Sequence, residues 1–191
     1  MYLFFDTETA GLPKNWKAPV HRINNWPRLV QVAWLLYDED GNLHETADYI
    51  IKPEGFRIPV ASTNIHGIST EKALAEGEDI EVVLNKLDDV VRKARYLVAH
   101  NMNFDVNILG AEFIRAAIDS DFYDKTRICT MKSSTHYCAI PGRYGYKWPT
   151  LTELHEKLFD QDFAEAHNAL ADIEATARCF WELKERGVIL H

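Results

Sequence analysis

Apolar residues in the first fifty positions follow the patterns of β-strands. Residues 2–5 are an apolar run that leads directly into carboxylates, and so short a run, closed by Gly11 and Pro13, predicts a buried strand. The apolar segment 29–37, a turn rich in Asp and Gly, and the segment 43–51 predict a hairpin of two further strands.

The rest of the chain alternates short strands with helices. One helical face is predicted by the apolar residues Ile80, Val83, Leu84, Leu87, Val90 and Val91. Further helices are predicted over 103–118, 150–159 and 168–186, strands over 96–100 and 126–131, and loops over 13–28 and 53–69. A hairpin followed by strands separated by helices predicts a mixed sheet covered by helices, in a single α/β domain spanning residues 1–191.

Composition agrees with this fold class. The 191 residues are 47% hydrophobic and 26% charged, which is typical of a globular chain that buries a substantial core. No apolar stretch approaches the ~20 residues that cross a bilayer, and no secretory signal is visible, so we expect no membrane association. Cys129, Cys138 and Cys179 are an odd, widely spaced set, which predicts reduced thiols and a cytoplasmic protein.

Charge is distributed unevenly along the chain. The net charge of −8 argues against a nucleic-acid partner, but the segment 122–150 has five basic residues and one acid. The same segment carries the aromatic residues Phe122, Tyr123, Tyr137, Tyr144, Tyr146 and Trp148. Interleaved basic and aromatic residues suit a chain of phosphates and stackable bases. The alternative is a solvated loop whose aromatic rings pack on the core.

Two carboxylates stand at the end of the first predicted strand. Because side chains alternate along a strand, Asp6 and Glu8 point to one face of the sheet and Thr7 points to the other. Carboxylates held side by side repel each other, and a hard divalent cation such as Mg²⁺ removes that repulsion. The alternative is a strand end whose acids point into water.

Three further residues complete a set that extends along the chain. Asp105 ends the motif His-Asn-x-x-Phe-Asp, in the first turn of a predicted helix, where the helix dipole favours its charge. His167 is followed five positions later by Asp172, at the start of the last predicted helix. Together with Asp6 and Glu8, these motifs resemble the DEDDh exonucleases, the DnaQ-like branch of the ribonuclease H-like superfamily, including polymerase III epsilon-type exonuclease domains.

The resemblance implies a fold and a catalytic site. The fold is a five-stranded mixed sheet of strand order 3-2-1-4-5 flanked by helices. Four acids, Asp6, Glu8, Asp105 and Asp172, would bind two divalent ions, Mg²⁺ or Mn²⁺, about 4 Å apart at the scissile phosphate. One ion would activate the attacking water and the other would stabilise the leaving 3′ oxygen, while His167 takes the proton of the water.

The resemblance also implies where a strand end would bind. The substrate-binding residues would be Thr7, Thr9, Leu12, Ile65, His66, Asn101 and Phe104. Many relatives have Thr where this chain has Ala10, and the loop 13–28 is longer than a minimal member needs. Both departures leave the four acids intact and lie where the strand end would bind.

The predicted function is a metal-dependent 3′–5′ exonuclease that releases nucleoside 5′-monophosphates from single-stranded ends, with DNA favoured over RNA. A chain that stops at His191 favours an enzyme acting alone, although a polymerase partner is compatible with the resemblance. Three alternatives remain: an RNA-trimming exoribonuclease, a non-catalytic nucleic-acid-binding module, and a phosphatase or nucleotidase acting on small substrates.

Overall fold

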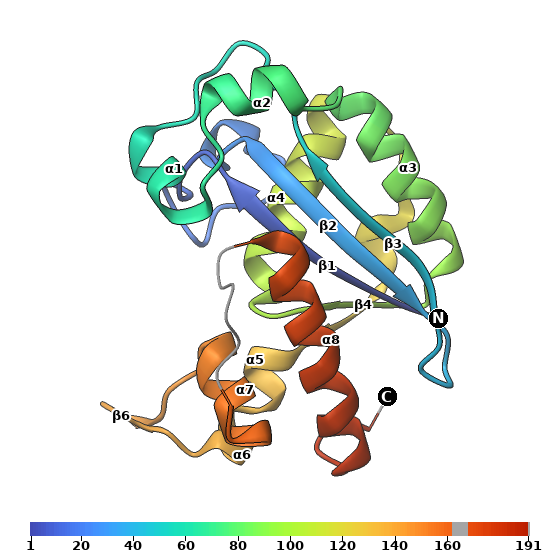
Figure 1. The fold of residues 1–191 in the computed structure, drawn as a ribbon, viewed down its shortest axis with the longest axis vertical. Helices are drawn as coiled ribbons and strands as arrows, with labels where there is room; N and C mark the ends of the chain where they lie inside the picture. The colour runs from blue at the N-terminus through green and yellow to red at the C-terminus, as the bar shows by residue number, and fades with distance from the viewer. Residues whose placement is uncertain (162–167, 191) are drawn as a thin grey trace.

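The computed structural model describes residues 1–161 and 168–190 and contains one five-stranded sheet (Figure 1). Its strands are β1 (Tyr2–Thr9), β2 (Leu29–Tyr37), β3 (Leu43–Ile50), β4 (Tyr96–Ala99) and β5 (Thr126–Cys129). They lie in the order β3-β2-β1-β4-β5, which confirms the predicted order. The strand β1 pairs antiparallel with β2 and parallel with β4, so it is central, as its apolar sequence predicted.

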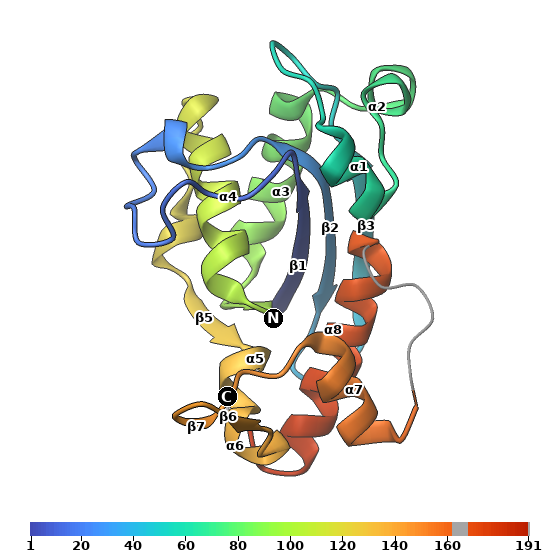
Figure 2. The same ribbon diagram turned by 90° about the vertical axis from the view of Figure 1, so that its left-hand side faces the viewer.

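Helices cover both faces of the sheet (Figure 2). The longer ones are α3 (Ile80–Lys93), α4 (Met102–Arg115), α7 (Leu151–Phe159) and α8 (Ala169–Glu185). Leu3 and Phe5 of β1 belong to a buried cluster with α3 and α4, whereas Tyr2 and Phe4 belong to a second cluster with α7 and α8. Successive side chains of β1 therefore enter opposite cores, as strand geometry requires. In the described part of the chain, none of the helices has the length and apolar character to cross a membrane.

The segment 53–69 is not the continuous loop that its composition predicted. It contains α1 (Val60–His66), and α2 (Thr70–Glu76) follows directly. Gly67 is the C-cap of α1, with a φ of 74°, a left-handed conformation that glycine adopts readily. The Ser69 side chain caps the start of α2 by accepting from the backbone N–H of Lys72. The pair packs over a small buried cluster that contains Val30, Ile58, Ile68 and Ala73.

The basic segment 122–150 is more ordered than predicted. The strand β5 ends at Cys129, and two single-turn helices, α5 (Thr130–Ser133) and α6 (Thr135–Cys138), precede the short strands β6 (Pro141–Gly142) and β7 (Gly145–Tyr146). The predicted strand 126–131 therefore extends too far. His100, which directly follows β4, lies within hydrogen-bond distance of the Thr130 hydroxyl (3.0 Å) and the Pro149 carbonyl (3.1 Å). It therefore connects the start of α5 and the end of this segment to the sheet.

Candidate active site

The carboxyl end of β1 directs its acids toward α8. The ligand oxygens of Asp6, Glu8 and Asp172 all lie within 4.8 Å of one another, and all three side chains are half-buried. Asp172 comes from the first turn of α8, whose N-cap is Asn168; the Asn168 side chain accepts from the backbone N–H of Ala171 at 3.2 Å. A register shift between Glu8 and Thr9 in the pairing of β1 with β2 marks the point where the strand leaves the regular ladder.

Asp105 approaches from the other face of the sheet. It lies in the first turn of α4, is almost fully buried, and accepts a hydrogen bond of 2.7 Å from the Thr7 hydroxyl. Thr7 therefore points away from Asp6 and Glu8, as the alternation along the strand predicted. The Asp105 carboxylate is outside the group of oxygens within 4.8 Å, although its charge still acts on Asp6 and Glu8.

Burial and mutual repulsion make these acids hard to ionise. Burial is the largest cause for Asp6, whose pKa is raised well above its usual range, and repulsion from Asp105, Asp172 and Glu8 adds to it. Burial, followed by repulsion from Asp172 and Asp105, raises the pKa of Glu8 to about 8. Burial also raises the pKa of Asp105 to about 7, while the Thr7 hydroxyl acts in the opposite direction.

A divalent cation fits this group of side chains. Among the described residues, no lysine or arginine forms an ion pair with Asp6, Glu8 or Asp105. Within residues 1–161 and 168–190, no ion pair to these three acids offsets the repulsion that raises their pKa values. Hard cations prefer carboxylate oxygen, and a positive ion between these acids would favour their charged forms. The donor set matches the chemistry that the sequence predicted for a metal site.

A cavity of about 330 Å³ lies beside the acids. Its lining residues are Thr7, Glu8, Thr9, Gly11, Leu12, Ala61, Ser62, Ile65, His66 and Phe104. Gly11 has a φ of 144°, which side-chain-bearing residues rarely adopt, and the Thr9 hydroxyl donates to the Gly11 carbonyl at 2.7 Å. The turn after β1 thus holds Leu12 at the mouth of the cavity, where it is 72% exposed.

Six of the seven predicted substrate-binding residues surround this one cavity; the exception is Asn101. Asn101 instead begins α4 in a left-handed conformation with a φ of 68°, at the turn that connects β4 to the helix. His66 ends α1, and its Nδ1 accepts from the backbone N–H of Ile68 at 3.2 Å, which leaves Nε2 as the N–H donor of the neutral ring. The prediction for His167 lies outside the described residues.

Two contacts near the site were not predicted from the sequence. Phe104 of the cavity packs against Trp16, with ring centroids 5.7 Å apart, and the buried carboxylate of Glu112 binds Arg28 and Arg115. Trp16 and Phe104 are far apart in sequence, and so are Glu112 and Arg28. A segment that contains Pro13, Pro19 and Pro27 carries no periodic signal that indicates such contacts.

Comparison with known protein families gives one match along most of the chain. Residues 3–180 match the sequence model of the family described as Exonuclease. The chain is 30% identical over 194 residues to the DNA polymerase III PolC-type protein of Mycoplasmopsis pulmonis, and 28% identical over 189 residues to the 3′-5′ exonuclease DinG of Bacillus subtilis. Those matches include 99% and 97% of this chain but only 12% and 18% of the two relatives.

Solved structures share the fold. The zinc-bound complex of Escherichia coli exonuclease I with single-stranded DNA superposes with a TM-score of 0.77 at 22% identity, over 97% of this chain and 40% of that one. The complex of the same enzyme with a dA16 oligonucleotide gives a TM-score of 0.73, also at 22% identity, over 96% and 40% of the two chains. This chain therefore corresponds to a part of each of these relatives.

Proposed function

Because this chain belongs to the DnaQ-like 3′–5′ exonuclease family, we propose that it hydrolyses phosphodiester bonds at the 3′ ends of single-stranded nucleic acid. The products are nucleoside 5′-monophosphates, and residues 1–191 act as one exonuclease domain. The observation that carries the proposal is the convergence of Asp6, Glu8 and Asp172 within 4.8 Å, beside a cavity open to solvent. DNA is the favoured substrate because PolC-type relatives are DNA polymerases by name, and exonuclease I binds DNA oligonucleotides.

Asp6, Glu8 and Asp172 would hold the divalent ions, with Asp105 as the fourth acid on the opposite side of β1. Bound Mg²⁺ or Mn²⁺ would supply Lewis-acid activation of water and would neutralise charge on the phosphodiester. The Thr7 hydroxyl holds the Asp105 carboxylate in place by donating to it. The chain thereby fixes its acids before substrate binds, since each is set on the central strand or in the first turn of a helix.

The remaining groups would position the strand end and move one proton. Leu12 and Ile65 offer exposed apolar surface for the terminal base, and His66 lines the same cavity. His167 accepts a proton from the attacking water as the new oxygen–phosphorus bond forms. The bond from phosphorus to the 3′ oxygen of the preceding nucleotide breaks, and that oxygen leaves with a proton from solvent.

Oligonucleotides labelled at one end test this proposal directly. With Mg²⁺, a 5′-labelled DNA strand should shorten one nucleotide at a time, whereas a 3′-labelled strand should release labelled mononucleotide at once. Chelation should stop both reactions, and an RNA strand of the same sequence measures the preference for DNA. Release of internal fragments, or full activity in chelator, would contradict the proposal.

The role of His167 needs a separate variant. General-base assistance contributes about 10²–10⁴-fold, so His167→Ala should lower turnover by that range while Mn²⁺ affinity stays near that of the parent. The increase in rate with pH near the pKa of a histidine should also disappear. If turnover and its pH profile both stay at the parent values, His167 is not the base.

A further inference from the structure

The loop 13–28 is an unusually basic segment of an acidic chain. It contains Lys14, Lys17, Arg22 and Arg28 and has no Asp or Glu. In the part of the chain that the structure describes, Lys14, Lys17 and Arg22 are exposed and none of them forms an ion pair. These three cations therefore have no role in holding the protein fold that the structure reveals.

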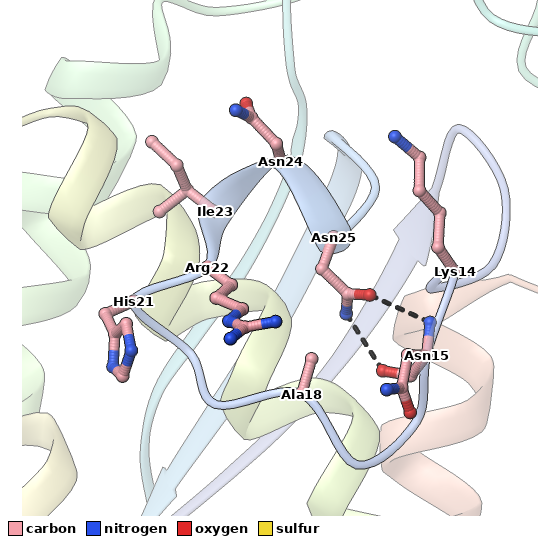
Figure 3. A pocket seen from close by; sticks show the side chains of 8 residues that line it. All are labelled: Lys14, Asn15, Ala18, His21, Arg22, Ile23, Asn24 and Asn25. Atoms are coloured by element: carbon pink, nitrogen blue, oxygen red, sulfur yellow. Dashed lines mark hydrogen bonds between the residues drawn. The ribbon is translucent and has the colours of Figure 1, made fainter.

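The loop has a defined shape. The Asn25 side chain accepts from the backbone N–H of Asn15 at 2.8 Å and donates to its carbonyl at 3.0 Å (Figure 3). Asn15 Oδ1 in turn accepts from the backbone N–H of Lys17 at 2.9 Å. A surface hollow of about 400 Å³ results, with Lys14, His21 and Arg22 on its walls. Lys14 and Arg22 thus border a concave surface whose loop is held by neutral amides, and Lys17 lies on the same loop.

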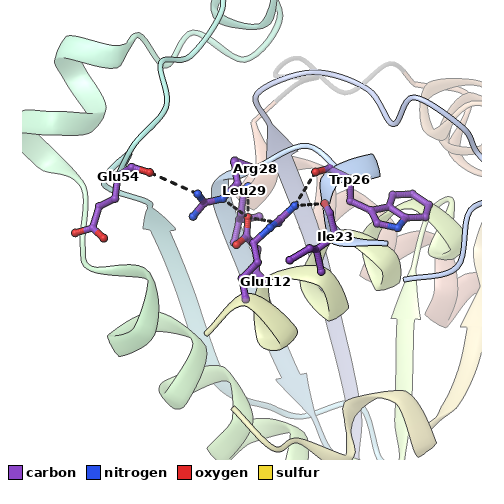
Figure 4. Close-up of polar contacts among 7 residues, drawn as sticks. Ile23, Trp26, Arg28, Leu29, Glu54 and Glu112 are labelled. Carbon is purple, nitrogen blue, oxygen red and sulfur yellow. Dashed lines mark hydrogen bonds and ion pairs between the residues drawn. The ribbon is translucent and has the colours of Figure 1, made fainter. Parts of the chain in front are cut away.

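A buried carboxylate attaches the base of the loop to α4 (Figure 4). Glu112 Oε1 accepts from Arg28 Nε at 2.9 Å and from the backbone N–H of Leu29 at 3.0 Å, and it pairs with Arg115 at 2.8 Å. Arg115 in turn donates to the carbonyls of Ile23 (2.5 Å) and Trp26 (2.7 Å). Because Trp26 is buried in the core, the loop is tied to the fold at this end.

The loop is also continuous with the cavity at the acids. Leu12, at the mouth of that cavity, precedes the first cation of the loop, Lys14, by two positions. Trp16 is 49% exposed and packs at 5.7 Å against Phe104, which lines the cavity. The two aromatic rings therefore extend the cavity wall outward to the loop 13–28. Figure 2 shows this loop beside α4.

We propose that the loop 13–28 is a second binding site for the substrate strand, on the 5′ side of the terminal nucleotide. Lys14, Lys17 and Arg22 bind backbone phosphates, and the exposed face of Trp16 stacks on a base. An aromatic platform beside unpaired cations is the arrangement that binds single strands without reading their sequence. This inference rests on the proposed function, because it takes the cavity as the position of the 3′ end.

A triple variant, Lys14→Gln/Lys17→Gln/Arg22→Gln, tests the loop. Its matched control is Lys86→Gln/Lys93→Gln/Arg95→Gln, which removes the same charge from exposed cations on α3 and the turn after it. Binding of a fluorescein-labelled oligo-dT is measured by anisotropy in Ca²⁺ over a range of salt. At about 0.1 M salt the loop variant should bind about 10- to 100-fold more weakly than the parent, with a salt slope smaller by about 2.

Two substitutions of Trp16 test the proposed stacking on a base. Trp16→Ala should weaken oligo-dT binding about five- to tenfold, and Trp16→Phe should restore most of it, because stacking needs a ring and not the indole N–H. The salt slope of both should equal that of the parent, since neither changes a charge.

Hydrolysis provides an independent readout. The parent should prefer a long oligo-dT over a dinucleotide in kcat/KM, and the loop variant should lose about tenfold or more of that preference while the α3 control keeps it. Equal binding and equal preference in the loop variant and the control would overturn the inference. If the parent binds oligo-dT through the loop but hydrolyses nothing, the proposed function fails and the loop inference stands.

Discussion

Glu112 is a fully buried carboxylate and Asp6 is a half-buried one, and the chain surrounds them in opposite ways. Glu112 is 1% exposed, forms ion pairs with Arg28 and Arg115, and accepts a hydrogen bond from a backbone N–H. Its buried negative charge is therefore offset by positive side chains. Asp6 lies instead among other acids, Glu8, Asp105 and Asp172, whose repulsion adds to burial in raising its pKa. Glu112 stabilises the fold, whereas the acids around Asp6 destabilise the metal-free protein.

This difference indicates which buried acids are structural and which are functional. A buried charge is costly unless an opposite charge offsets it, and acids that repel one another at one site are stabilised by an added positive charge. Perturbed pKa values of this kind gather at functional sites. The contrast also explains why acids alone are poor evidence in the sequence, where Glu112 and Asp105 stand on the same helix.

The largest expected effect is on turnover. Asp6→Asn should reduce hydrolysis by more than about 10³-fold, because it removes a metal ligand from the site. Glu112→Gln makes the same chemical change at the paired acid and should lose far less activity at temperatures where it is folded. Initial rates on a labelled oligonucleotide measure both. If the two variants lose the same activity, the distinction between the two acids is wrong.

The stability of the same two variants should change in opposite directions. Glu112→Gln should lower the free energy of unfolding by about 3 kcal/mol, or roughly 6–12 °C in melting temperature, because two arginines lose their charged partner. Asp6→Asn should raise the melting temperature of the metal-free protein. Glu39→Gln, in an exposed turn, serves as the control and should change it by under about 0.5 kcal/mol. A stable Glu112→Gln protein would contradict the structural role.

The pH dependence of stability sharpens the comparison. The pKa of Glu8 is raised from 4.5 to about 8 in the fold, so folding favours the protonated form. That contribution to stability is complete below pH 4.5 and is lost as pH rises toward 8. Metal-free parent protein should therefore melt at lower temperature as pH rises through this range. Asp6→Asn should change less, because the raised pKa of Asp6 itself no longer contributes. Parallel curves for parent and variant would argue against repulsion at this site.

Substitutions in the basic segment 122–150 should have a smaller effect on oligo-dT binding, because cations of this segment contact other side chains of the protein. Lys147 pairs with Glu153 at 2.5 Å, Lys125 pairs with Asp121 at 3.0 Å, and Arg143 lies over the Tyr144 ring. Arg143→Gln/Lys147→Gln should weaken oligo-dT binding less than about threefold, because Lys147 would have to leave its partner to bind a phosphate. If this variant weakens oligo-dT binding as much as the loop 13–28 variant does, both segments bind the strand.

The sequence predicts the parts of this molecule that depend on short-range pattern. The two-residue period of a strand placed Asp6 and Glu8 together and Thr7 opposite, and the apolar run before them predicted a central strand. The helices α1 and α2 were missed because they are only two turns long, and their ends depend on the caps Gly67 and Ser69.

Contacts between distant segments could not be predicted in this way. Thr7 and Asp105 are 98 positions apart, and Arg28 and Glu112 are 84 apart, so no window along the chain contains both members of either pair. The net positive charge of 122–150 is visible in the sequence, but the partners of its cations are not. Only the fold separates cations that are paired from the exposed ones of the loop 13–28.

The central claim is that the acids around Asp6 are held together for a divalent cation, and melting at pH 8 with and without Mn²⁺ tests it most directly. Any ligand that binds only the folded state raises the melting temperature. We predict that Mn²⁺ raises the melting temperature of the parent by several degrees and leaves that of Asp6→Asn almost unchanged. No increase in the parent, or an equal increase in both proteins, would contradict the claim.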